Sequence, residues 1–191
     1  MTRPLVPGAK RDTRSKFERC HAFVARWEGG FVKHPSDPGG ATKYGVSLRF
    51  LRSAGKLGDV DGDGDITEAD IRALAPETAA AILKIHFWDP LSLDRLPAPL
   101  ALVVYDTAVN MGPGVARRLV QEALLVKVDG IWGPKTWAAL FSCDPGRVAH
   151  SVIRLRRGRY SRLINAKPEL QAFYQGWSSR VFSLERAMLE V

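Results

Sequence analysis

Glycine and proline divide this chain into segments in which apolar residues recur at helical spacing. The first segment, residues 13–27, carries apolar side chains three and four positions apart, and Gly29–Gly30 ends it. Strand signals occur at 30–33 and 42–46, where they favour one small hairpin. The sequence therefore predicts a mainly α protein with little sheet. Further helices are expected at 48–54, 77–88, 100–110, 115–125, 134–141, 148–165 and 170–189.

Basic residues outnumber acidic residues by 28 to 20, which gives the chain a formal net charge of +8. Such a charge favours an anionic partner, and nucleic acid, a bacterial envelope and an acidic glycan all qualify. No nucleic-acid reader motif accompanies the basic residues, so we expect no nucleic-acid partner. The four histidines lack the spacing of metal ligands, which argues against a zinc peptidase.

Residues 1–12 are basic and contain two prolines, so we expect a flexible arm there. The N-terminal region has no apolar run long enough for a signal peptide, and no stretch of the sequence is long and apolar enough for a membrane span. The sequence therefore predicts a protein that is made and kept in the cytoplasm. Cys20 and Cys143 are expected to be free core thiols, with a disulfide formed after release from the cell as the alternative.

Glu28 follows directly on the apolar stripe of the first helix. Its carboxyl group is expected to be partly desolvated and to lie at the negative end of the helix macrodipole, and both effects disfavour ionisation. Glycosidic cleavage needs such a protonated acid, because the leaving sugar oxygen must receive a proton as the bond breaks. Gly29 and Gly30 leave open space for a substrate beside the carboxyl group.

The loop after Glu28 offers two partners for such an acid. Asp37 lies among prolines and glycines, so we expect it to be exposed and ionised, able to stabilise an oxocarbenium-like transition state or to position water. Thr42 could hold that water by a hydrogen bond. Taken on spacing alone, Glu28 could equally be an ordinary helix-terminal residue and Asp37 a turn former.

The runs Trp27–Phe31 and Asp37–Ser47 closely resemble the opening of the glycoside hydrolase 108 family. Its members are phage and prophage endolysins, N-acetylmuramidases of lysozyme-like fold. The resemblance implies a mainly α, lysozyme-like fold with a hairpin or loop beside Glu28. It also implies that Glu28 is the general acid that cleaves the β-1,4 bond between N-acetylmuramic acid and N-acetylglucosamine in bacterial peptidoglycan, without a cofactor. In the Glu, Asp, Thr triad of phage-type lysozymes the Thr usually falls one residue later than Thr42.

Two runs in the second half, 105–112 and 128–136, resemble the predicted peptidoglycan-binding region of the same family. The resemblance implies a lysozyme-like catalytic segment at 13–98 and a helical peptidoglycan-binding region at 99–191 packed on it. Asp106 and Asn110 share one helix face, either as a buried hydrogen-bond anchor or as a wall of the substrate site. Tyr44 and Trp88 are candidates for stacking on sugar rings, with a place in the core as the alternative.

The acidic loop at 59–70 fits the EF-hand template. Gly64 stands at the sharp turn, and Asp70 takes position 12 with a shorter arm than the usual Glu. The pattern predicts a structural Ca²⁺ ion, with a metal-free acidic turn as the alternative. The expected ligand residues are Asp59, Asp61, Asp63, Asp65 (through its carbonyl) and Asp70.

Six arginines and no acid occupy residues 147–162, which are predicted to be helical. They form either a solvated helix face or a surface that attracts anionic envelope polymers and outer-membrane headgroups. We expect a monomer that reaches peptidoglycan from the host cytoplasm after holin-type release, as the resemblance implies. The alternative function is a non-catalytic cell-wall-binding or secretion-accessory protein. The arginines are Arg147, Arg154, Arg156, Arg157, Arg159 and Arg162.

Overall fold

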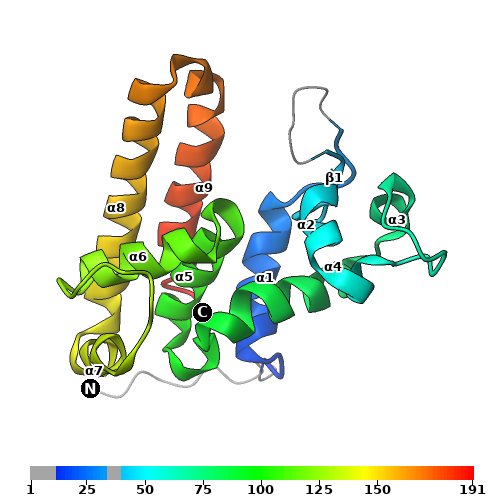
Figure 1. Ribbon diagram of the computed structural model, residues 1–191. Coiled ribbons are helices and arrows are strands. Elements are labelled where there is room, and N and C mark those ends of the chain that lie inside the picture. The colour runs from blue at the N-terminus through cyan, green and yellow to red at the C-terminus, as the bar shows by residue number, and fades with distance from the viewer. Residues whose placement is uncertain (1–11, 34–39) are drawn as a thin grey trace, which may run out of the picture.

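A computed structural model describes residues 12–33 and 40–191, so most of the predicted arm at 1–12 lies outside the described residues. The predicted mainly α, lysozyme-like fold with a small hairpin beside Glu28 is confirmed (Figure 1). The helices are α1 (Lys16–Trp27), α2 (Leu48–Ser53), α3 (Glu68–Ala73), α4 (Pro76–Leu83), α5 (Ala98–Met111), α6 (Pro113–Ala123), α7 (Pro134–Ser142), α8 (Pro145–Ala166) and α9 (Tyr174–Ala187). The strands are β1 (Thr42–Lys43) and β2 (Val46–Ser47).

Short 3-10 and π-helical turns join several of these helices. A π-helical turn, η2 (Lys84–Trp88), continues α4, so the helix predicted at 77–88 is present but changes its pitch at its end. The 3-10 turns are η1 (Gly55–Gly58), η3 (Asp89–Leu91), η4 (Leu93–Arg95) and η5 (Pro168–Phe173). None of the described helices is both long and apolar enough to cross a membrane.

The first helix is delimited by its caps. Ser15 and Glu18 form a capping box at the start of α1, in which the Ser15 hydroxyl accepts from the Glu18 N–H and the Glu18 carboxylate accepts from the Ser15 N–H. At the other end the backbone leaves the helical region at Glu28, whose φ of −91° and ψ of 96° are extended. The helix therefore ends on the residue that the sequence singles out.

Helix α5 lies at the centre of the larger of two hydrophobic cores. All nine of its residues from 100 to 108 are buried, which explains why this helix is apolar on every side. It packs against α1, α6 and α8, and α8 in turn packs against α9 as an antiparallel hairpin (Figure 1). The segments expected at 13–98 and 99–191 thus share one core.

The smaller core joins the hairpin to α2, α3 and α4, and it contains Val46 and Leu51 among its buried side chains. Phe87 packs against both cores. Glu28 follows α1, which belongs to the larger core, and precedes the hairpin, which belongs to the smaller one. It therefore lies where the two parts of the molecule meet.

The hairpin differs from the predicted one. Residues 42–46 were expected to pair as one strand with 30–33, but they fold back on themselves, with Lys43 opposite Val46. The reason is the two-residue turn Tyr44–Gly45, in which both residues have positive φ, 52° and 80°, the signature of a type I′ turn. The stretch 30–33 contributes a single bridge, between Val32 and Thr42.

Candidate active site

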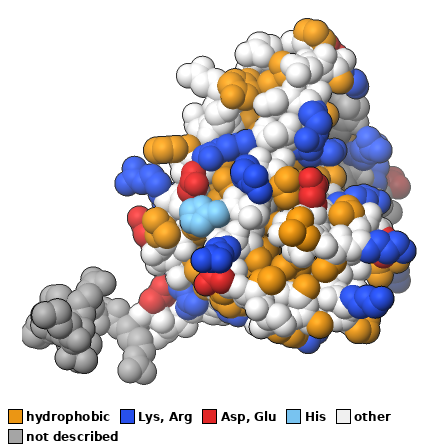
Figure 2. All heavy atoms as spheres, turned by 90° about the vertical axis from the view of Figure 1, so that its left-hand side faces the viewer, with side chains coloured by type: hydrophobic (Ala, Val, Ile, Leu, Met, Phe, Trp, Pro, Cys, Tyr) orange, Lys and Arg blue, Asp and Glu red, His pale blue; other side chains and the backbone are white. Residues whose placement is uncertain are grey.

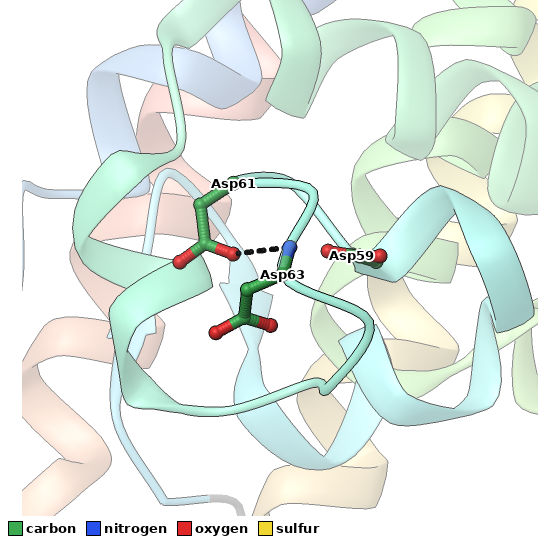
Figure 3. Close-up of side chains that lie close together, drawn as sticks. All are labelled: Asp59, Asp61 and Asp63. Atoms are coloured by element: carbon green, nitrogen blue, oxygen red, sulfur yellow. Dashed lines mark hydrogen bonds between the residues drawn. The ribbon is translucent and has the colours of Figure 1, made fainter.

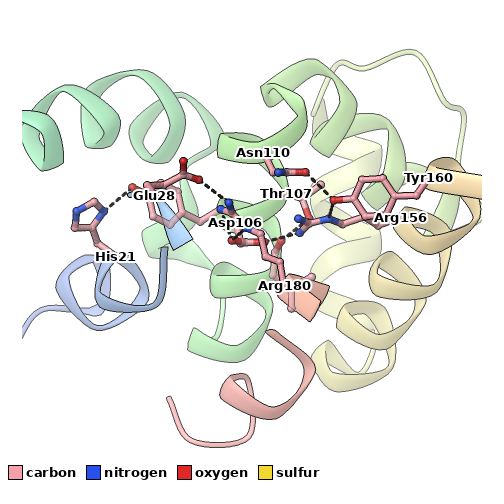
Figure 4. A network of polar contacts seen from close by, with 10 residues as sticks. His21, Glu28, Asp106, Thr107, Asn110, Arg156, Tyr160 and Arg180 are labelled. Carbon is pink, nitrogen blue, oxygen red and sulfur yellow. Dashed lines mark hydrogen bonds and ion pairs between the residues drawn. The ribbon is translucent and has the colours of Figure 1, made fainter. Parts of the chain in front are cut away.

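Glu28 presents a mostly buried carboxyl group at the end of α1. Its backbone N–H donates to the carbonyl of Val24 at 3.1 Å, and its side chain is 18% exposed. Arg180 of α9 donates from Nη1 to the Glu28 Oε1 atom at 2.6 Å (Figure 4). The candidate acid is thus fixed by a contact between residues 152 positions apart.

Arg180 is itself held by Asp106 of α5. The Asp106 carboxylate is fully buried, and its Oδ1 atom lies 2.9 Å from the Arg180 Nε atom and 2.7 Å from Nη2. Burial alone would lower the pKa of Arg180, but the adjacent carboxylates of Asp106 and Glu28 outweigh it and raise that pKa. Arg180 is therefore a permanent cation whose position is set by Asp106.

A second arginine completes the buried cluster. Arg156 of α8 is fully buried and donates from Nη1 to the other oxygen of Asp106. Its Nε atom donates to the Tyr160 hydroxyl at 3.0 Å, which donates onward to Asn110 Oδ1 at 2.7 Å. Glu28, Arg180, Asp106 and Arg156 thus form a chain of alternating charge that ties α8 and α9 to the end of α1 (Figure 4).

Neither arginine is predicted from the sequence as part of the site, although Arg156 belongs to the predicted basic helix. The predicted setting of Glu28 includes burial and the helix end, whereas the structure adds the guanidinium of Arg180. A signal for it exists in the sequence: Trp177, Arg180 and Leu184 recur at helical spacing, so Arg180 occupies a place on the apolar stripe of α9. A charged residue in such a position needs a buried partner.

Burial contradicts the predicted substrate-binding role of two residues. Trp88 is fully buried and packs edge-on against Phe17 and Tyr105, with ring centroids 5.4 Å apart in each case. Asp106 is likewise inaccessible, because both of its oxygens bind arginine. Both are core residues, and Asp106 takes the buried-anchor role left open above. Asn110 is half-buried and is engaged by Tyr160.

The hairpin lies directly against Glu28. Tyr44 donates its N–H to the carbonyl of Gly29 at 3.0 Å, and Thr42 exchanges two backbone hydrogen bonds with Val32, both 2.8 Å. A Cβ atom added to Gly45 would lie 2.9 Å from Cγ of Glu28. The Gly45 backbone therefore covers one side of the Glu28 side chain, and a residue other than glycine would collide with it.

The other predicted residues of this region have mixed outcomes. Thr42 and Tyr44 are half-buried within the hairpin, and the Lys43 ammonium lies 5.3 Å from the centre of the Tyr44 ring. Asp37 lies outside the described residues. The structure brings the hairpin and Glu28 together, and the roles of Asp37 and Thr42 stay predictions.

The acidic loop gathers three of its predicted ligands. Carboxylate oxygens of Asp59, Asp61 and Asp63 lie within 4.8 Å of one another (Figure 3). Asp59 also accepts from the N–H groups of Gly62 and Gly64, at 2.8 and 3.1 Å. Three convergent carboxylates suit a hard cation, whose preferred ligands are oxygen atoms.

Asp70 is not among these converging carboxylates, contrary to its predicted role as a metal ligand. Its Oδ1 atom accepts from the N–H groups of Val60 (2.6 Å) and Asp61 (3.3 Å), and its Oδ2 atom accepts from Thr67 (2.7 Å). It belongs to the capping box of α3, because a side chain as short as Asp reaches back to the helix start. Burial alone would raise the pKa of Asp70, but these three donors outweigh it and lower that pKa.

The predictions for the basic helix and for the cysteines are each wrong in part. Arg156 is internal, and Arg157 pairs with Glu185 at 2.6 Å, so the arginines of α8 do not form one free basic face. Figure 2 shows Lys and Arg side chains scattered among apolar and acidic ones on this side of the molecule. Cys20 is a buried thiol as expected, with a pKa raised by burial to about 12, whereas Cys143 is exposed.

Residues 21–112 match the family model described as Glycosyl hydrolase 108, and residues 115–182 match the one described as Predicted Peptidoglycan domain. Among solved structures, SagA of Brucella abortus is similar to this chain, with a TM-score of 0.75 and 28% identity over 91% of this chain and 94% of that one. No curated protein matches the sequence. Residues 21–112 thus resemble the glycosyl hydrolase 108 family and residues 115–182 a predicted peptidoglycan domain, and the two matches together suggest a peptidoglycan hydrolase.

Proposed function

We propose that the protein is an N-acetylmuramidase of the phage endolysin type. It hydrolyses the β-1,4 bond between N-acetylmuramic acid and N-acetylglucosamine, with Glu28 as general acid. The observation that carries the proposal is the setting of Glu28, a largely buried carboxyl group fixed by Arg180 within the segment that matches the hydrolase family. Such a fixed carboxyl group is what proton transfer to a glycosidic oxygen requires.

Arg180 suits this chemistry at one particular stage. Once Glu28 has given its proton to the leaving oxygen, a carboxylate remains in a poorly hydrated place. The guanidinium of Arg180, 2.6 Å away, stabilises that charge. Asp106 holds the guanidinium in position and is not in contact with solvent, so it acts as a positioning residue.

The two further residues of the site enter the proposal through the family resemblance. Asp37 supplies a carboxylate that stabilises the positive charge developing on the sugar ring or positions water. Thr42 orients a water molecule through its hydroxyl group. The backbone hydrogen bonds between Thr42 and Val32 fix Thr42 relative to Gly29 and Glu28, which supports this role for Thr42.

The direct test is the digestion of purified peptidoglycan sacculi, with mass spectrometry of the soluble fragments. N-acetylmuramic acid at the new reducing ends is the expected result. N-acetylglucosamine at those ends would refute the proposed bond. Binding to sacculi without any released fragment would favour the non-catalytic, secretion-accessory alternative.

Replacement of Gly45 by alanine should lower turnover by about tenfold or more, because the added methyl group pushes the Glu28 side chain from its place. The same change strains a residue with φ of +80°, so the free energy of unfolding should fall by about 1–2 kcal/mol. The measurements are initial rates on sacculi and a urea unfolding curve.

Gly55 provides the matched control for this prediction. It has a φ of +61°, and a Cβ atom there would meet no other atom within 4 Å. Gly55→Ala should therefore lower stability by a similar amount while leaving turnover unchanged. Equal turnover in the two variants would show that Gly45 does not position Glu28.

We propose a monomer that stays in the host cytoplasm until a holin-type partner opens the inner membrane. The exposed arginines Arg147, Arg154 and Arg162 then assist its approach to anionic outer-membrane or envelope polymers. Co-expression with a holin should cause lysis, whereas the protein alone should not.

We also propose that the acidic loop holds a structural Ca²⁺ ion, bound by the carboxylates of Asp59, Asp61 and Asp63 and the carbonyl of Asp65. The convergence of the three carboxylates supports this proposal. Asp70 contributes by holding the loop to α3. An oxygen-bound Ca²⁺ ion would stabilise the loop and supply no chemistry for glycan cleavage.

Calcium should raise the melting temperature relative to EDTA, since an ion that binds only the folded state contributes about 2.7 kcal/mol at a hundred times its Kd. Joint replacement of Asp61 and Asp63 by Asn should abolish the difference. Identical melts in calcium and EDTA would exclude the ion.

Replacement of Asp70 by Asn should lower the melting temperature in both solutions. Because the folded pKa of Asp70 is lowered, its contribution to stability is present above the unfolded pKa of about 3.9 and is lost as pH falls further.

A further inference from the structure

The outer face of the α8–α9 hairpin carries a groove that the site at Glu28 does not use. The groove has a volume of about 310 Å³. We call it the α8–α9 groove. It is lined by Arg157, Tyr160, Ser161, Tyr174, Ser178 and Phe182.

This groove combines aromatic surface with polar groups. Tyr174 and Phe182 are 42% and 59% exposed, so both present aromatic surface at the groove. Behind them the Tyr160 ring stacks on Trp177, with centroids 4.7 Å apart and planes at 15°, so the floor is rigid.

Polar groups flank this aromatic floor. Ser161 and Ser178 place hydroxyl groups beside the rings. The Arg157 guanidinium is oriented at the groove by Glu185, 2.6 Å away.

The groove faces away from Glu28. Tyr174, Ser178 and Phe182 follow one another at intervals of four and so form one stripe of α9. Arg180 stands two residues from both Ser178 and Phe182, which is roughly 200° around the helix. A ligand in the groove is therefore separated from the Glu28–Arg180 pair by the body of α9.

We propose that the α8–α9 groove binds a second stretch of peptidoglycan glycan strand, apart from the stretch that is cleaved. Sugar rings have apolar faces and hydroxyl edges, so an aromatic floor flanked by hydroxyl groups suits them. All six lining residues fall within the segment that matches the predicted peptidoglycan domain.

The position of the groove fits a polymeric substrate. The end of the α8–α9 hairpin projects beyond the rest of the molecule (Figure 1), and Ser161 and Tyr174 lie toward that end. Attachment there keeps the enzyme on the wall between cleavage events, because a second contact raises the local concentration of substrate. The inference rests on the proposed function for its choice of ligand.

The test measures binding to intact sacculi by co-sedimentation, with Glu28→Gln as a background that does not degrade them. Joint replacement of Tyr174 and Phe182 by Ser should raise the Kd about tenfold, since two stacking contacts are lost. The conservative pair Tyr174→Phe and Phe182→Tyr should bind as the background does. Phe141, 58% exposed and outside the groove, is the matched control, and Phe141→Ser should not change the Kd.

Kinetics with Glu28 present provide a second readout. The Ser pair should raise KM on sacculi and leave kcat unchanged, and its hydrolysis of short soluble fragments should equal that of the parent. Sacculi binding that is unchanged in the Ser pair, or equally weakened by Phe141→Ser, would overturn the proposal. So would a parent that sediments as a dimer and a Ser pair that sediments as a monomer, because the groove would then bind a second copy. A parent that binds through the groove but releases no reducing ends would refute the proposed function and leave this inference standing.

Discussion

Replacement of Glu28 by Gln should abolish the release of reducing ends from peptidoglycan while the protein stays folded. Glutamine has almost the same shape and can still accept a hydrogen bond from Arg180, but it has no acidic proton for the leaving oxygen. A general acid contributes about 10²–10⁴ in rate. Initial rates on sacculi and a thermal melt followed by circular dichroism measure the two effects.

Glu77 is a suitable control for this substitution. It is exposed in the first turn of α4, far along the chain from the site. Glu77→Gln removes the same charge and should leave the rate unchanged. Residual activity of the Glu28 variant within tenfold of the parent, in a folded protein, would mean that the general acid is another group.

Replacement of Asp106 by Ala should have the largest effect on stability of any change discussed. It leaves the buried cations of Arg156 and Arg180 without their shared carboxylate. Removal of one partner from a buried ion pair costs about 3–5 kcal/mol. Urea unfolding curves of the variant and the parent give this difference in the free energy of unfolding.

The exposed pair between Arg157 and Glu185 is the matched control for Asp106. Its side chains are 48% and 32% exposed, so Glu185→Ala should cost less than about 1 kcal/mol. Where the Asp106 variant remains folded it should also turn over slowly, because Arg180 is no longer held against Glu28. A loss of stability no greater than that of Glu185→Ala would show that the buried cluster is not ionised.

The sequence predicted the residues that follow from local patterns. The stripe of α1 placed Glu28 correctly at a helix end, and the shared helix face of Asp106 and Asn110 did become a common attachment for α8. Helix periodicity also located the other helices except α3, because apolar spacing reflects burial directly.

The features that the sequence did not predict depend on contacts between distant elements or on backbone angles. Arg180 reaches Glu28 only because α9 packs beside α1, and no local pattern near residue 28 contains that information. The turn at Tyr44–Gly45 was missed because Tyr seldom adopts a positive φ. Trp88 and Asp70 were assigned from residue type, whereas burial and capping decide what each contacts.

The ion pair between Glu28 and Arg180 also bears on when the enzyme becomes active during its synthesis. Ribosomes make residue 28 before residue 180, so a nascent chain holds the candidate acid before it holds the cation that fixes it. The hairpin and α1 can form meanwhile, because their contacts are local. Chains that stop before residue 180 should therefore hydrolyse peptidoglycan slowly, because their candidate acid lacks that cation.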